Sequence, residues 1–115
     1  MVRKSENCAV KVNEGMRGGP GSVVLTEIAS GEEMFSKARL FSKILLRPGC
    51  GIGYHVHENE CEIFCVLKGT AFYNDDGVET VITAGDVTIV KSGHGHGIEN
   101  RSDEDVELVA LIPLM

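Results

Sequence analysis

The sequence predicts an all-β fold, and three observations support that prediction. About eight to ten short segments rich in apolar and β-branched residues recur along the chain, and none is a convincing long helix. Turn residues separate them, and NDDG at 74–77 is a strong hairpin signal because glycine accepts the positive φ of a tight turn. The length of 115 residues suits one domain around one core. Strands at this spacing indicate a sandwich or a barrel.

The expected elements follow one another at short intervals. Residues 1–21 have little period and end in MRGGPG, so we expect an N-terminal arm before a barrel formed by residues 22–115. The expected strands are 22–29, 37–47, 62–67, 69–74, 78–83, 87–90 and 106–112. A polar turn is expected after the first strand, at 30–33. One short helical turn at 31–36 is the alternative, because Ser30 precedes Glu33 by three residues.

Charge and hydropathy exclude two classes of partner. The chain has 17 acidic and 11 basic residues, a net charge of −6, which repels nucleic acid. The N-terminus has no apolar signal-peptide core, and the longest apolar run, 106–115, is too short to span a bilayer. We therefore expect a soluble, cytoplasmic protein with neither a nucleic acid nor a membrane partner.

Four cysteines occur at positions 8, 50, 61 and 65. Two disulfides or a zinc site are alternatives, but there is no Cys-x-x-Cys spacing and no export signal, so free thiols are expected. Cys61 and Cys65 have the opposite strand parity to Glu62, which directs them away from any site that Glu62 faces.

The most informative stretch is 49–69, GCGIGYHVHENECEIFCVLKG. His55 and His57 are two residues apart, so on a strand both imidazoles point to one face. Glu62 follows a short polar run, which predicts a hairpin that brings two nitrogens and one carboxylate together, a ligand set suited to a divalent transition metal. A fourth ligand must come from His94 or His96, the only other histidines.

These residues resemble the two motifs of the cupin family. Gly49, His55, His57, Glu62 and Gly69 fill the first motif, and Gly85, Gly93, His96 and Asn100 match the second. Lys91 stands where the family has proline, which affects the turn before Gly93 and no metal-binding position. The resemblance implies a double-stranded β-helix, or jelly-roll barrel, whose metal is held by His55, His57, Glu62 and His96.

Function is expected to centre on that metal. One Mn, Fe, Ni, Zn or Cu ion with this ligand set has a net charge of about +1 and two open octahedral positions, which suit a small anionic or carboxylate ligand. The first hypothesis is therefore a metal-dependent lyase, dioxygenase or isomerase acting on a carboxylate, keto acid or enol. The chain is similar to small oxalate-decarboxylase-related cupins, but that resemblance does not itself assign a reaction. A non-catalytic binding or sensing module and a structural metal are the alternatives.

Other polar residues near the motifs have less defined roles. His94 is a candidate acid/base or outer-shell group, with a solvated loop residue as the alternative. Glu58 and Glu60 are the remaining acid/base residues near the motif. Asp86 and Asn100 are expected to form turn and loop hydrogen bonds.

Apolar residues on both faces of two strands predict a homodimer. Ile63, Cys65 and Leu67 lie opposite Phe64 and Val66, which either line the pocket or belong to the core. Phe41 and Leu45 likewise lie on the charged face of their strand. A second sheet or a two-fold partner must cover these side chains.

Overall fold

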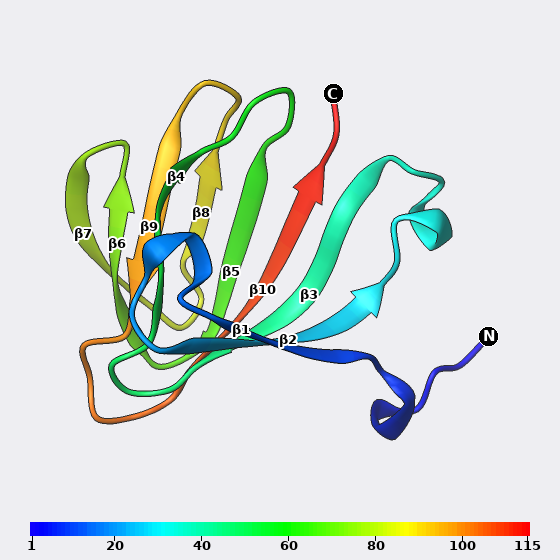
Figure 1. Ribbon diagram of the computed structural model, residues 1–115, viewed down its shortest axis with the longest axis horizontal. Helices are drawn as coiled ribbons and strands as arrows, with labels where there is room; N and C mark the ends of the chain where they lie inside the picture. The colour runs from blue at the N-terminus through cyan, green and yellow to red at the C-terminus, as the bar shows by residue number, and fades with distance from the viewer.

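The computed structural model describes all 115 residues and contains two antiparallel sheets that face each other (Figure 1). The larger sheet has the strand order β1-β2-β3-β10-β5-β8, and the smaller has the order β4-β9-β6-β7. The strands are β1 (Val10–Glu14), β2 (Ser22–Ala29), β3 (Ala38–Leu46), β4 (Gly51–Val56), β5 (Glu62–Lys68), β6 (Thr70–Asp75), β7 (Val78–Thr83), β8 (Val87–Val90), β9 (Gly95–Glu99) and β10 (Val106–Pro113). The predicted all-β jelly roll is confirmed.

Only short 3₁₀ turns accompany the strands: η1 (Ser5–Asn7), η2 (Met16–Gly18) and η3 (Glu32–Met34). At η3 the Glu33 amide donates to Ser30 Oγ and the Ser30 amide donates to the Glu33 carboxylate, so the alternative of a short capped helical turn is correct. No helix here has the length and apolar character needed to span a bilayer. The cytoplasmic location and the lack of nucleic acid partners stay predictions.

Strand β1 lies within the segment that was expected to be an arm of little regular structure. It pairs with β2 from Val10↔Thr26 to Glu14↔Ser22 and thereby extends the larger sheet by one strand. The division of the chain into an arm and a barrel at residue 21 stays a prediction.

The hairpin predicted between residues 55 and 62 is wrong. Strand β4 pairs with β9, whereas β5 pairs with β10 and β8, so the connection after His57 crosses from the smaller sheet to the larger (Figure 1). Glu62 therefore meets the histidines across the space between the sheets, where both faces are buried. Alternation along one strand fixes a face but not a pairing partner.

The core fills the space between the sheets. Its fourteen clustered residues include Phe64 and Val66, each 1% exposed, so these two side chains are core residues. Asn100 is fully buried and donates to the carbonyls of Leu46 and Glu104, and Asp86 accepts from the amide of Thr83. Both expected turn and loop roles are confirmed.

Candidate metal centre

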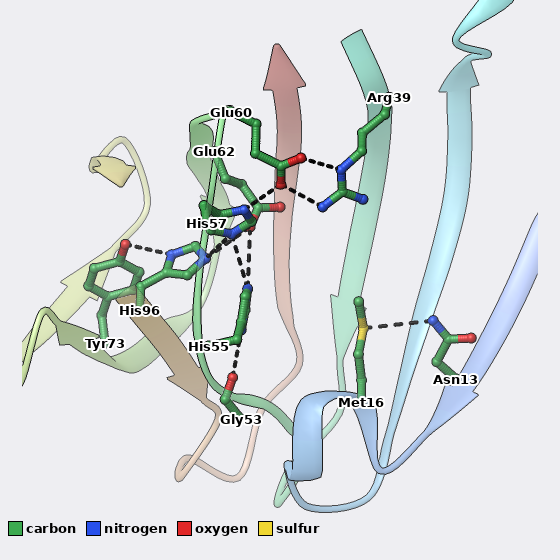
Figure 2. A network of polar contacts seen from close by, with 10 residues as sticks. All are labelled: Asn13, Met16, Arg39, Gly53, His55, His57, Glu60, Glu62, Tyr73 and His96. Carbon is green, nitrogen blue, oxygen red and sulfur yellow. Dashed lines mark hydrogen bonds and ion pairs between the residues drawn. The ribbon is translucent and has the colours of Figure 1, made fainter. Parts of the chain in front are cut away.

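Three imidazoles and one carboxylate converge between the sheets (Figure 2). His55 lies on β4, His57 follows its last residue, His96 lies on β9 and Glu62 opens β5. One ligand atom from each residue falls within 4.8 Å of all the others. His57, Glu62 and His96 are buried, and His55 is partly exposed. The structure thus brings together the four residues named by the two motifs.

The Nε2 atoms of the histidines are the atoms that converge. His57 Nε2 lies 3.1 Å from His55 Nε2, 3.2 Å from His96 Nε2 and 3.1 Å from Glu62 Oε1. Glu62 Oε1 lies 2.9 Å from His96 Nε2 and 3.9 Å from His55 Nε2.

These separations test whether the donors fit a metal ion. Ligands about 2.1 Å from a metal are about 3.0 Å apart at right angles, and about 3.4 Å apart at every edge of a tetrahedron. Four of the separations match the right-angle value, and the fifth is clearly longer. The donor set therefore fits a divalent transition metal with octahedral geometry better than a tetrahedral site.

Each imidazole is oriented through its Nδ1 atom. His55 Nδ1 lies 2.8 Å from the Gly53 carbonyl oxygen, and His57 Nδ1 lies 2.6 Å from Glu60 Oε2. Because a carbonyl and a carboxylate only accept, both Nδ1 atoms donate, which leaves the Nε2 lone pairs free for a metal. His96 Nδ1 lies 2.8 Å from the Tyr73 hydroxyl, and the Phe64 ring stacks on the His96 ring at a centroid distance of 5.0 Å.

The partner of His57 is itself held by an arginine. Arg39 on β3 donates from Nε and Nη2 to the two carboxylate oxygens of Glu60, each at 2.6 Å (Figure 2). Arg39 and then His57 hold the pKa of Glu60 at about 2, although partial burial opposes the shift. Glu60 therefore stays ionised and fixes the orientation of the His57 ring.

The pKa values of His57 and His96 shift in opposite directions. Hydrogen bonds to Glu62 and then Glu60 raise the pKa of His57, whereas burial lowers the pKa of His96. Burial would raise the pKa of Glu62, but the imidazoles of His55, His57 and His96 beside it outweigh burial and lower that pKa. The carboxylate is thus ionised and lies among three ring nitrogens.

The other sequence candidates lie outside this cluster. The His94 side chain is 58% exposed and its Nδ1 lies 2.8 Å from Asp76 Oδ2, so the structure makes it a loop residue paired with an exposed acid. Glu58 is exposed, and the four cysteines are unpaired thiols. Sequence reasoning did not find Arg39 and Tyr73, whose partners are more than 20 residues away, and it named Glu60 as an acid/base candidate without its contact to His57.

Comparison with known proteins places the chain in a family. The cupin domain profile matches residues 42–112. The chain belongs to the cupin family. It is 42% identical to the oxalate-binding protein of Thermotoga maritima, over 100% of this chain and 94% of that one.

Solved cupin-like structures agree with this assignment. The crystal structure of a predicted oxalate decarboxylase from Thermotoga maritima is 41% identical, with a TM-score of 0.95 and complete coverage of both chains. An uncharacterised double-stranded β-helix protein from Klebsiella pneumoniae is 26% identical, with a TM-score of 0.69, and the match covers 84% of this chain and 78% of that one.

The carboxylate behind His57 leads to a first prediction. We expect Glu60→Gln to weaken the affinity for a divalent transition metal by about 10- to 100-fold, because the ring loses its charged acceptor. Metal competition titrations at a pH of about 8 measure this where imidazoles are neutral. Glu58→Gln is the matched control, since Glu58 is exposed and forms no side-chain hydrogen bond. Equal affinities for the two variants would contradict the orienting role of Glu60.

The raised pKa of His57 leads to a second prediction. A metal ligand must be a neutral imidazole, so protons compete with the metal as the pH falls through a pKa above the ordinary 6.5. We expect metal affinity to fall with decreasing pH and metal uptake to release a proton near neutrality. Calorimetry in buffers of different ionisation enthalpy counts that proton. An affinity that stays constant from about pH 8 to about pH 6 would contradict this assignment.

Proposed function

We propose that this cupin binds a small carboxylate or 2-oxo acid through one divalent transition metal held by His55, His57, Glu62 and His96. The observation that supports this most strongly is the convergence of three oriented imidazoles and one ionised carboxylate within 4.8 Å. The oxalate-binding protein from Thermotoga maritima, 42% identical to this chain, supports the choice of a carboxylate.

Charge favours an anion at this site. Three neutral imidazoles and one carboxylate give a divalent ion a net charge of about +1 and leave two octahedral positions without a protein ligand. A bidentate carboxylate fills both positions and neutralises that charge. Arg17 and Arg39 also line the metal cavity. Arg39 is paired with Glu60, so Arg17 is the basic lining residue whose charge no carboxylate neutralises.

The cavity wall favours binding over proton-transfer chemistry. Besides the metal-ligand candidates, its lining residues are apolar side chains and the two arginines. Glu60, the nearest additional carboxylate, is held by Arg39 and His57. A general base needs a titratable group that is free to take a proton from the ligand.

Metal-dependent enzyme chemistry is the second candidate. A bound divalent ion acts as a Lewis acid on a chelated carboxylate. A lyase, dioxygenase or isomerase activity agrees with the similarity to the structure of a predicted oxalate decarboxylase. In this case Arg17 is the basic residue available to the anion, and the apolar wall keeps water away from it.

Metal-dependent binding is the third prediction. At about 100 times its Kd, oxalate or pyruvate should stabilise metal-loaded protein by about 2.7 kcal/mol, a rise in Tm of roughly 10 °C or more. Metal-free protein and His96→Ala should not respond, because neither offers the complete ligand set. Following loss of the acid with and without dioxygen separates binding from turnover. A rise of equal size with and without metal would contradict the proposal.

We also propose that two copies of this chain pair through the outer face of the larger sheet. The residues of two registered rows support this proposal: Ile89, Ile63, Leu111 and Phe41 in the first, and Val87, Cys65, Val109 and Lys43 in the second. Seven of these eight side chains are apolar. Val87 and Ile89 are each 57% exposed in the single chain, although they border this apolar surface.

The oligomeric state is the fourth prediction. Light scattering at micromolar concentration should give twice the chain mass of 12.4 kDa. Val87→Asp should give the single-chain mass, because a buried carboxylate without a partner opposes association. Val81→Asp is the matched control, since Val81 is 54% exposed on β7 of the other sheet. A single-chain mass for the unmodified protein would rule out the dimer.

A further inference from the structure

A second cavity adjoins the metal cavity. Its volume is about 400 Å³, and most of its lining comes from β1, β2 and β3, which form one end of the larger sheet. The linings of the two cavities share Met16, Leu25, Arg39 and Leu40. Figure 2 shows Met16 and Arg39 between the histidines and strands β1 and β2. The two cavities therefore lie side by side and share part of one wall.

Local contacts hold Met16, one of the shared lining residues, against β4, the strand that carries His55. Asn13 Nδ2 donates to the Met16 sulfur at 3.8 Å. The turn η2, which contains Met16, packs on Gly53, where an added Cβ would lie 2.0 Å from the Arg17 carbonyl oxygen. Gly53 is also the residue whose carbonyl accepts from His55. Met16 thus stands at a defined position beside the candidate ligands, and its flexible thioether lets a ligand pass.

Volume separates the roles of the two cavities. The metal cavity has about 50 Å³, far below the roughly 300 Å³ at which small-molecule pockets begin, whereas the second cavity falls within that range. A ligand with its carboxylate at the metal has room there for little more than that group. Any longer body must pass the shared wall.

We propose that the ligand of this cupin is a medium-chain 2-oxo acid whose carboxylate end lies at the metal and whose chain lies in the cavity beneath β1, β2 and β3. This inference rests on the proposed function and narrows its ligand class. Met16, Leu25 and Leu40 contact the chain where it leaves the metal. Lys11 and Glu27 line only the larger cavity, so a polar far end is accommodated there.

A homologous series of 2-oxo acids tests the proposal on metal-loaded, full-length protein. Calorimetric Kd values are compared from pyruvate to 2-oxooctanoate. Burial of each methylene should tighten binding by about two- to fourfold until the cavity is filled. If neither oxalate nor any 2-oxo acid of the series binds, the proposed function and this inference both fail. If oxalate or pyruvate binds and the longer acids bind no tighter, only this inference is overturned.

The second part of the test fills the larger cavity with a bulky side chain. Glu27 is an exposed residue of β2 that lines the larger cavity. Glu27→Trp should keep pyruvate affinity within about twofold and abolish the gain per methylene. Glu27→Gln, which removes the charge alone, and Val12→Trp, a bulky change outside the lining, should both retain that gain. If Glu27→Trp does not fold, Ser42→Leu fills the same cavity; a gain retained in the filled cavity overturns the proposal.

Discussion

The ionised carboxylate of Glu62 is the constraint on which the centre of this molecule depends. It is 6% exposed, and burial of a charge is costly unless the charge is paired or binds a metal. The nearby imidazoles of His55, His57 and His96 belong to the opposite sheet or follow directly from it, so the favourable contacts of Glu62 act between the two layers. The carboxylate therefore specifies how the sheets face each other as well as what can bind between them.

The three imidazoles are held by three chemically different acceptors. Gly53 offers a backbone carbonyl, Glu60 a carboxylate fixed by Arg39, and Tyr73 a hydroxyl whose pKa burial raises to about 12. A carboxylate acceptor makes its imidazole a stronger electron donor than a carbonyl or a phenol does. The candidate ligands are thus unequal, and His57 is the one most strongly tied to the charge outside the centre.

Local spacing predicted the strands, and the resemblance to the two cupin motifs predicted the four-residue cluster. His-x-His places two rings on one face whatever the neighbouring strand, and the second motif singles out His96. Which strands pair within a sheet depends on residues far apart in the sequence, so the hairpin between His57 and Glu62 was predicted wrongly. The strand at Val10–Glu14 was missed because it is largely exposed and depends on pairing with β2. Arg39 was likewise invisible, since its partner lies 21 residues away.

The metal-binding motifs and the lining of the larger cavity, where the proposed ligand chain lies, come from different parts of the sequence. All four candidate metal ligands fall within residues 42–112, the segment that matches the cupin domain profile. Nearly all of the larger cavity is lined by residues before that segment, on β1, β2 and the start of β3. A change in the first two strands would therefore alter the proposed ligand cavity and leave the metal-binding motifs intact. Met16 and Arg39 line both cavities, so these two residues are where the two parts of the chain meet.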